Sequence, residues 1–277
     1  MINIMFCGNH GVFDGMLTCA LSIFHRSELK EAIHFHLLTM DVSHLNPKFT
    51  AITKEQVTFF EKVIKKYNAE NNVFVYDVSN LYREEFDGCP NESAYCSPYT
   101  LIRLLADRIE GLPDKILYLD VDVMFNRDIH LLWDIDVSDV EYAAARDHYG
   151  KFLIYPNYIN AGVLLWNLKR MRETGIFAKA RELLRAKKLT FADQSALIRS
   201  TTKKKMLSQR FNDQKFLYKK TVVRHFSKRL FYLPYPHTDN IKQWQVDRIH
   251  KVFGYHCFDD IFNEYLTLIQ EFKGEQA

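Results

Sequence analysis

Two aspartates, Asp120 and Asp122, follow an apolar run at residues 115–119. The run predicts a buried strand, and side chains two apart at its end point to the same side. Two neighbouring carboxylates repel each other unless a cation lies between them. Ligands of open α/β sheets bind beyond the carboxyl ends of the strands, and oxygen ligands suit magnesium or manganese. The pair therefore predicts a site for a divalent cation and a phosphate-containing ligand.

The ordinary alternative is that such D-x-D triplets are common and lie in solvated turns. The position of this triplet at the end of an apolar run counts against that alternative, because uncompensated charge beside a buried strand is costly.

The composition bounds the class of protein. The chain has 277 residues, 47% of them hydrophobic and 14% aromatic, enough for one large domain with a core. Its 37 basic and 34 acidic residues give a formal net charge of +3, too small to indicate nucleic-acid binding. No apolar stretch approaches the roughly 18 residues of a membrane span, and no signal-peptide pattern is present. We expect a cytoplasmic protein.

The cysteines support the same compartment. They are scattered and lack the paired spacing of zinc or redox motifs, which favours free thiols in a reducing environment. The five are Cys7, Cys19, Cys89, Cys96 and Cys257.

The elements that must position the two aspartates follow from hydrophobic periodicity. Alternating apolar and amphipathic segments predict β-α-β units around a mostly parallel, Rossmann-like sheet. Strands are expected at residues 2–6, 35–40, 73–78, 115–119, 142–146 and 161–166. Helices are expected at residues 16–24, 56–67, 98–109, about 168–187 and 193–200. From Lys203 onward the composition becomes basic and aromatic, which predicts a C-terminal appendage packed on the sheet.

Three motifs in this order resemble glycosyltransferase family 8, over residues 2–226 or so. They are LYLDVDVM (117–124), NAGVLLWNL (160–168) and DQ (193–194), and their combination is far more specific than any one of them. The family includes bacterial lipopolysaccharide galactosyl- and glucosyltransferases and glycogenin. The resemblance implies a GT-A type nucleotide-diphospho-sugar transferase fold, with a catalytic domain at residues 1–226 and a small extension, ending in a helix, at 227–277. It also implies transfer of a hexose, galactose or glucose, from a UDP-sugar to a saccharide, in cell-surface glycan or lipopolysaccharide synthesis.

The resemblance implies donor-binding roles for several residues. Asp120, Val121 and Asp122 match the family's D-x-D, which holds Mn2+, or Mg2+, against the donor diphosphate. Further matches to donor contacts are Arg103, Asn160, Ala161 and Gly162. The ordinary alternatives are a solvated helix charge for Arg103 and an ordinary turn before a strand for Asn160.

Three more residues match the family's catalytic positions. Asp147 matches an acid that hydrogen-bonds sugar hydroxyls, and Asp193 and Gln194 match a pair beside the anomeric carbon. Asp193 also suits the N-cap of the helix that follows it. Family members retain the anomeric configuration, and an amide such as Gln194 is a poor nucleophile. The resemblance therefore favours a front-face mechanism, in which the leaving phosphate takes the acceptor proton, over the two-carboxylate scheme of retaining hydrolases.

The chain departs from the family after the first strand. The family has Asp-Asp-x-Tyr there, for uracil and ribose, whereas an ungapped match places Asn9, His10 and Val12 at those positions, after Cys7. Asn9 still offers an acceptor and a donor to a uracil edge, so we take Cys7 and Asn9 as donor contacts. Loss of the tyrosine removes a stacking surface.

The chain also departs from the family's H-x-x-G-x-x-K-P-W, whose histidine binds metal and whose lysine binds diphosphate. Residues 221–226 predict a strand that ends in His225, but the lysine and tryptophan follow only at Lys242 and Trp244. We take His225 as the third metal ligand and Lys242 as the diphosphate contact, which implies a longer loop between them. His237 is the rival ligand.

The basic, aromatic stretch at residues 203–244 has three interpretations. It is a solvated surface, a lid over the donor, or a peripheral attachment site for anionic lipid at the inner face of a membrane. The third suits a lipid-linked glycan as acceptor.

Two other functions compete with sugar transfer. A metal-dependent nucleotidyltransferase also uses a strand-end acidic pair, but it would normally have a basic, glycine-rich loop, and residues 7–11 contain no lysine or arginine. A non-catalytic nucleotide-sugar or glycan-binding relative is kept open by the altered Asn9-His10, although the intact motifs argue against it.

Overall fold

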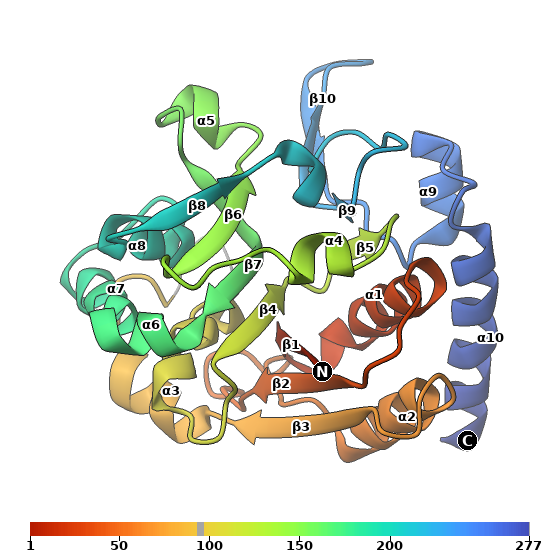
Figure 1. Ribbon diagram of the computed structural model, residues 1–277, viewed down its shortest axis with the longest axis horizontal. Coiled ribbons are helices and arrows are strands. Elements are labelled where there is room, and N and C mark those ends of the chain that lie inside the picture. Colours follow the sequence, from red (N-terminus) through yellow and green to blue (C-terminus); the bar gives the residue numbers. More distant parts are fainter. Residues whose placement is uncertain (93–96, 277) are drawn as a thin grey trace.

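A seven-stranded sheet forms the centre of the computed structural model, which describes residues 1–92 and 97–276 (Figure 1). Its strand order is β3-β2-β1-β4-β7-β6-β8, and β7 alone runs antiparallel to its neighbours. The strands are β1 Ile2–Cys7, β2 Ile33–Thr39, β3 Asn72–Asp77, β4 Lys115–Leu119, β6 Tyr142–Arg146, β7 Ile159–Asn167 and β8 Lys204–Leu207. The expected mostly parallel α/β sheet is confirmed.

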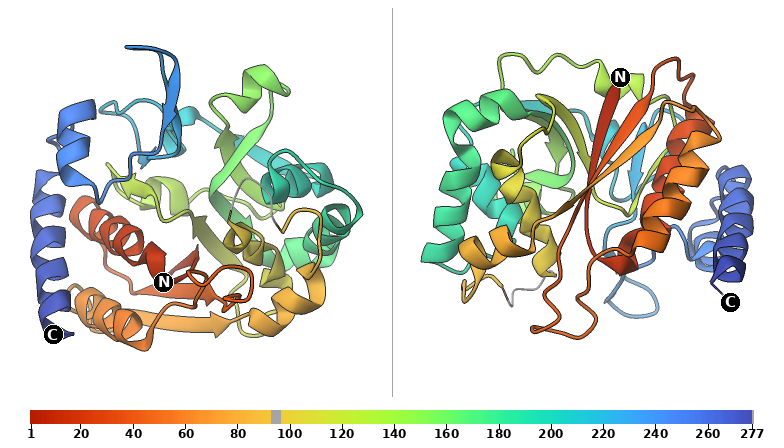
Figure 2. Two further views of the ribbon diagram at one scale, coloured as in Figure 1. Left: turned by 180° about the vertical axis from the view of Figure 1, so that it is seen from behind. Right: turned by 90° about the horizontal axis from the view of Figure 1, so that it is seen from below.

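Helices cover both faces of this sheet (Figure 2). One face packs against α1 Phe13–Arg26, α2 Lys54–Lys65 and the C-terminal α10 Asp259–Glu275. The other packs against α3 Ser79–Phe86, α6 Leu168–Thr174, α7 Ile176–Ala186 and α8 Ala192–Ser200. Two short helices, α4 His130–Trp133 and α5 Gly150–Leu153, lie in connections. Each face has its own buried apolar cluster, so both sides of the sheet are core.

Two expected helices differ from the structure. Residues 98–109 form two 3-10 helices, η2 Pro98–Thr100 and η3 Ile102–Arg108, in place of one α-helix. The expected helix at 168–187 is broken at Gly175, whose φ of 64° lies in the left-handed region and ends α6 before α7 begins. Tertiary contacts outweigh helix propensity in the first segment, because residues 102–106 are all buried.

The N-cap interpretation of Asp193 is also wrong. Helix α8 begins at Ala192, and its N-cap residue Phe191 makes no capping side-chain bond. Asp193 instead lies inside the first turn, buried, where its carboxylate is directed to another partner described below.

The C-terminal segment shares its core with the sheet. Strand β9 Val223–His225 pairs with β5 Val123–Phe125, directly after the two aspartates, and β10 Arg229–Phe231 forms a hairpin with β11 His237–Asp239. After α9 Val246–Phe253, helix α10 packs along α1, with Phe272 at 4.7 Å from Phe13 between ring centroids. Tyr265 donates a hydrogen bond to Asp14, 3.0 Å long.

Two findings bear on the compartment. Within residues 1–92 and 97–276, no helix has the length and apolar character to cross a membrane. Cys7, Cys19, Cys89 and Cys257 are free thiols, while Cys96 lies outside the described residues.

Truncation of Phe262 tests whether the extension belongs to the core. Phe262 is fully buried on α10, so Phe262→Ala should lower the free energy of unfolding by about 3–5 kcal/mol. Leu266→Ala, on the exposed side of the same helix, should change it by less than about 0.5 kcal/mol. Urea denaturation measures both, and equal small effects would show that residues 227–277 form a separate appendage.

Candidate active site

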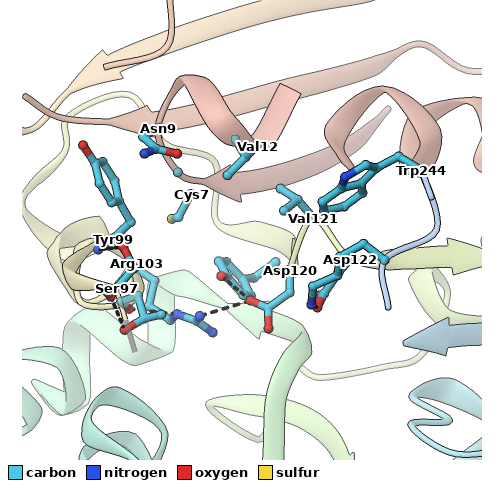
Figure 3. Close-up of a pocket in the computed structure, with 14 residues that line it drawn as sticks. Cys7, Asn9, Val12, Ser97, Tyr99, Arg103, Asp120, Val121, Asp122 and Trp244 are labelled. Atoms are coloured by element: carbon cyan, nitrogen blue, oxygen red, sulfur yellow. Dashed lines mark hydrogen bonds and ion pairs between the residues drawn. The ribbon is translucent and has the colours of Figure 1, made fainter. Parts of the chain in front are cut away.

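A cavity of about 340 Å³ opens beyond the carboxyl ends of β1 and β4 (Figure 3). Its lining brings together residues from the first strand, the 3-10 segment, the D-x-D triplet and the C-terminal extension. They are Cys7, Gly8, Asn9, Val12, Ser97, Tyr99, Thr100, Arg103, Tyr118, Asp120, Val121, Asp122, Lys242 and Trp244. The extension therefore forms part of the cavity wall through Lys242 and Trp244.

Two carboxylates and one imidazole meet at the edge of this cavity. Asp120, Asp122 and His225 each offer a ligand atom, and these atoms lie within 4.8 Å of one another. His225 Nε2 is 3.1 Å from Asp122 Oδ1 and 3.9 Å from Asp120 Oδ2. The β5–β9 pairing produces this arrangement, because it places His225 opposite Val123, next to the triplet. Two hard oxygen donors and one nitrogen fit manganese or magnesium.

Gly162 makes the close approach possible. A Cβ atom at this position would lie 2.3 Å from His225 Cε1 and 2.7 Å from Asp120 Oδ2. Its carbonyl also accepts a 2.8 Å hydrogen bond from the Asp120 backbone amide. Any side chain larger than hydrogen would therefore push the carboxylate and the imidazole apart.

Lys242 compensates the charge of Asp122. Its ammonium group pairs with Asp122 Oδ2 and donates a 3.2 Å hydrogen bond to the Phe226 carbonyl. Burial alone would raise the pKa of Asp122, but Lys242 and then His225 outweigh it and hold the pKa well below its usual value. Asp122 is therefore a carboxylate. The rival histidine, His237, lies on β11, bonded to the Tyr235 carbonyl and outside this cluster.

Arg103 compensates Asp120, so its interpretation as a solvated helix charge is wrong. It is 4% exposed and stacks over the Tyr118 ring at 4.2 Å. Its guanidinium donates to Asp120 Oδ1 at 3.1 Å (Figure 3). It also donates to the Ala161 carbonyl at 2.7 Å. Its Nε lies 3.3 Å from Asp193 Oδ2, so Arg103 is the charged partner of the buried Asp193. Burial raises the pKa of Asp193, and Arg103 opposes that rise.

A chain of hydrogen bonds connects Asp147 to His225. Asp147 Oδ2 accepts from Asn160 Nδ2 at 2.9 Å, and Asn160 Oδ1 accepts from Asn212 Nδ2 at 2.8 Å. Asn212 Oδ1 in turn lies 3.0 Å from His225 Nδ1. An oxygen facing Nδ1 makes that nitrogen a donor, so Nε2 is the nitrogen that faces the two aspartates and that a bound cation would use.

Asn212 was missed by the sequence analysis. It is fully buried, but it belongs to the basic segment that the sequence presents as a surface or a lid. Its role depends on contacts with residues distant in the chain, so no local pattern points to it.

The matched Asp-Gln and Asn-Ala-Gly residues lie together behind the cavity lining. Gln194 Oε1 accepts a 2.9 Å bond from the Ala161 backbone amide, and Asn160 Oδ1 accepts a 3.0 Å bond from the Gly162 amide. The Ala161 carbonyl is held by Arg103. Both backbone groups of Ala161 are thus fixed by side chains from two different helices.

Cys7 and Asn9, the expected donor contacts at and just after the end of the first strand, line the cavity, but the side chain of Asn9 already has partners. Its Oδ1 accepts from the Gly11 amide at 3.1 Å, and its Nδ2 donates to the Lys48 carbonyl at 3.2 Å. Burial raises the pKa of the Cys7 thiol, which therefore stays neutral. Aromatic surface in the cavity comes from Tyr99, Tyr118 and Trp244, which the sequence analysis did not assign to the donor.

Comparison with known proteins gives consistent matches. Residues 3–231 match the family described as glycosyl transferase family 8. A putative glycosyltransferase from Haemophilus influenzae is 27% identical over 192 residues, which are 65% of this chain and 52% of the relative. This chain spans about half the length of that relative and also of a probable galacturonosyltransferase-like protein from Arabidopsis thaliana, 52% in each case.

Solved structures of LgtC share the fold. Galactosyltransferase LgtC in complex with donor and acceptor sugar analogs is 19% identical, with a TM-score of 0.66 over 98% of this chain and 96% of that one. An active-site variant of LgtC with glutamate in place of glutamine is 20% identical, with a TM-score of 0.68 and the same coverage. These matches confirm the GT-A fold.

Substitution of Asn212 tests its effect on His225. Asn212→Leu removes the group that fixes the imidazole, so the affinity for Mn2+ should fall about 10–100-fold, as for other residues that orient metal ligands. Asn212→Asp retains an acceptor for Nδ1 and should preserve most of the affinity. Isothermal titration calorimetry measures both, and circular dichroism controls for folding. Equal loss in the two variants would contradict this account, because the aspartate keeps the acceptor that faces Nδ1.

Proposed function

The chain belongs to glycosyl transferase family 8, and we propose that it is a retaining, metal-dependent enzyme that moves a hexose from a UDP-sugar to a saccharide acceptor. The single observation that supports this most is the meeting of Asp120, Asp122 and His225 at the edge of a cavity that also contains Arg103 and Lys242. Galactose or glucose is the proposed sugar, and cell-surface glycan or lipopolysaccharide synthesis the proposed context.

The donor diphosphate would bind beside the three clustered side chains. Asp120, Asp122 and His225 would hold Mn2+ or Mg2+, which when bound supplies positive charge against the diphosphate as it leaves. Lys242 adds a second positive charge at the same place, and its pairing with Asp122 keeps it there. The chain thus offers an anion-binding wall made of two segments distant in sequence.

The sugar would lie toward Asp147, Asn160 and Gln194. Asp147 accepts bonds from the Tyr149 and Gly150 amides and from Asn160, which fixes its carboxylate in one orientation. A carboxylate has about four lone-pair positions, and these bonds use three of them, so about one position would remain for a sugar hydroxyl. Gln194 offers an amide and no good nucleophile, which supports the front-face mechanism, with the leaving phosphate taking the proton of the acceptor hydroxyl.

The nucleotidyltransferase alternative finds no support in the comparisons, whereas LgtC was solved with donor and acceptor sugar analogs. The variant of LgtC that carries an active-site glutamate for glutamine supports Gln194 as the corresponding group here. We also propose the cytoplasm as the location, in keeping with the four free thiols among the described residues.

A donor panel tests the reaction. Purified protein incubated with UDP-sugars should release UDP slowly from one of them with Mn2+ present and not after chelation, because water replaces the missing acceptor. Asp122→Asn should lower this release by at least about a hundredfold. Its circular dichroism spectrum should stay close to that of the parent protein, since the carboxylate lines the cavity and is not part of the apolar core.

Asp239→Asn is the matched control, because Asp239 pairs with Arg248 outside the cavity. It should release UDP at the parental rate. An active Asp122→Asn protein that is indifferent to chelator would contradict the proposal. Absence of both release and binding for every UDP-sugar would move the non-catalytic alternative ahead.

A further inference from the structure

Two apolar tips project from one end of the molecule, as the views in Figures 1 and 2 agree. The α5 tip comprises residues 152–155, where Phe152 is 78% and Leu153 80% exposed. The hairpin tip comprises residues 232–235, between β10 and β11, where Leu233 is 84% and Tyr235 67% exposed. Large apolar side chains gathered in this way on a surface mark an interaction site.

Each tip is joined through a short stretch of chain to residues of the candidate active site. Helix α5 begins at Gly150, shortly after Asp147, whose Oδ1 accepts a 2.6 Å hydrogen bond from the Gly150 amide. The hairpin tip lies in the longer loop between His225 and Lys242. The two supports touch, since the Leu230 amide donates a 3.2 Å bond to the Tyr149 hydroxyl. A surface that receives both tips would therefore hold the active site at a fixed orientation.

The segments that carry the tips are basic in sequence. Residues 148–158 and 214–236 contain no aspartate or glutamate. Their basic residues are Lys151, Lys215, Lys219, Lys220, Arg224, Lys228 and Arg229. Arg224 is buried, whereas Lys151 lies over the Phe152 ring at 5.0 Å, at the base of the α5 tip. The partner that complements these tips is apolar inside and negatively charged at its surface.

We propose that the two tips insert into a bilayer that contains anionic lipid and seat the active site against its surface. Apolar side chains with flanking basic groups are the common means of peripheral membrane attachment, and tyrosine suits the headgroup boundary. A bilayer accepts two separate projections, whereas a protein partner would need two matching hollows.

Vesicle flotation tests the attachment. The full chain should float with vesicles of phosphatidylcholine and phosphatidylglycerol, less so at high salt, and poorly with phosphatidylcholine alone. The double variants Phe152→Ser/Leu153→Ser and Leu233→Ser/Tyr235→Ser should each partition at least about tenfold more weakly, because each removes two apolar side chains from the lipid. The control Leu266→Ser, an exposed position on α10, should float like the parent.

Acceptor-free UDP release separates this proposal from the proposed function. The tip variants should release UDP at the parental rate, since none of the four residues lines the cavity. Release without vesicle binding by the parent, or parental flotation by both double variants, would overturn the membrane proposal alone. Self-association that the tip variants abolish, without any flotation, would overturn it in favour of a second copy of the chain. Flotation without UDP release from any donor would leave the attachment standing and contradict the enzyme.

Discussion

The compensation of two negative charges at the carboxyl end of β4 organises this protein. Asp120 and Asp122 must meet positive or hydrogen-bonding groups there, and the chain supplies them from segments far apart in sequence. Arg103 comes from η3, His225 from β9 and Lys242 from the loop before α9. Because Lys242 and His225 hold the pKa of Asp122 low despite burial, the carboxylate persists as a charge. A cation that bound there, as proposed, would meet carboxylates that are already held in place.

A second constraint couples the two sides of the reaction centre. Asn160 and Asn212 connect the acid proposed to bind sugar with the imidazole proposed to bind metal, and Asn212 is fully buried. Amides whose hydrogen-bond partners are all fixed orient one another, so a displacement of the acid at one end of this chain of hydrogen bonds would alter the orientation of the imidazole at the other. Gly162 completes the constraint, because only glycine leaves room for His225 beside Asp120.

Local patterns in the sequence predicted the parts of the fold that depend on local physics. Strand β4 occupies residues 115–119 as expected, because its apolar run can be buried in the sheet only if the two aspartates that follow lie beyond the end of the strand. The single α-helix expected at residues 98–109 is wrong because the tertiary contacts of Arg103 and its buried neighbours determine the backbone there. The single helix expected at residues 168–187 is wrong because Gly175 adopts a left-handed conformation that ends α6. Asn212 and the β10–β11 hairpin lie in a segment whose basic composition does not indicate its secondary structure or its contacts. Their positions depend on pairing with distant strands, which no periodicity reveals.

The central claim is that His225, with Asp120 and Asp122, forms a divalent-cation site. The most direct measurement is a Mn2+ titration, followed by electron paramagnetic resonance, of the parent protein, His225→Ala and His237→Ala in the presence of UDP. The account predicts one bound ion per chain in the parent and in His237→Ala, and an affinity at least about a hundredfold weaker in His225→Ala. Parental binding by His225→Ala, or loss of the site in His237→Ala alone, would contradict it.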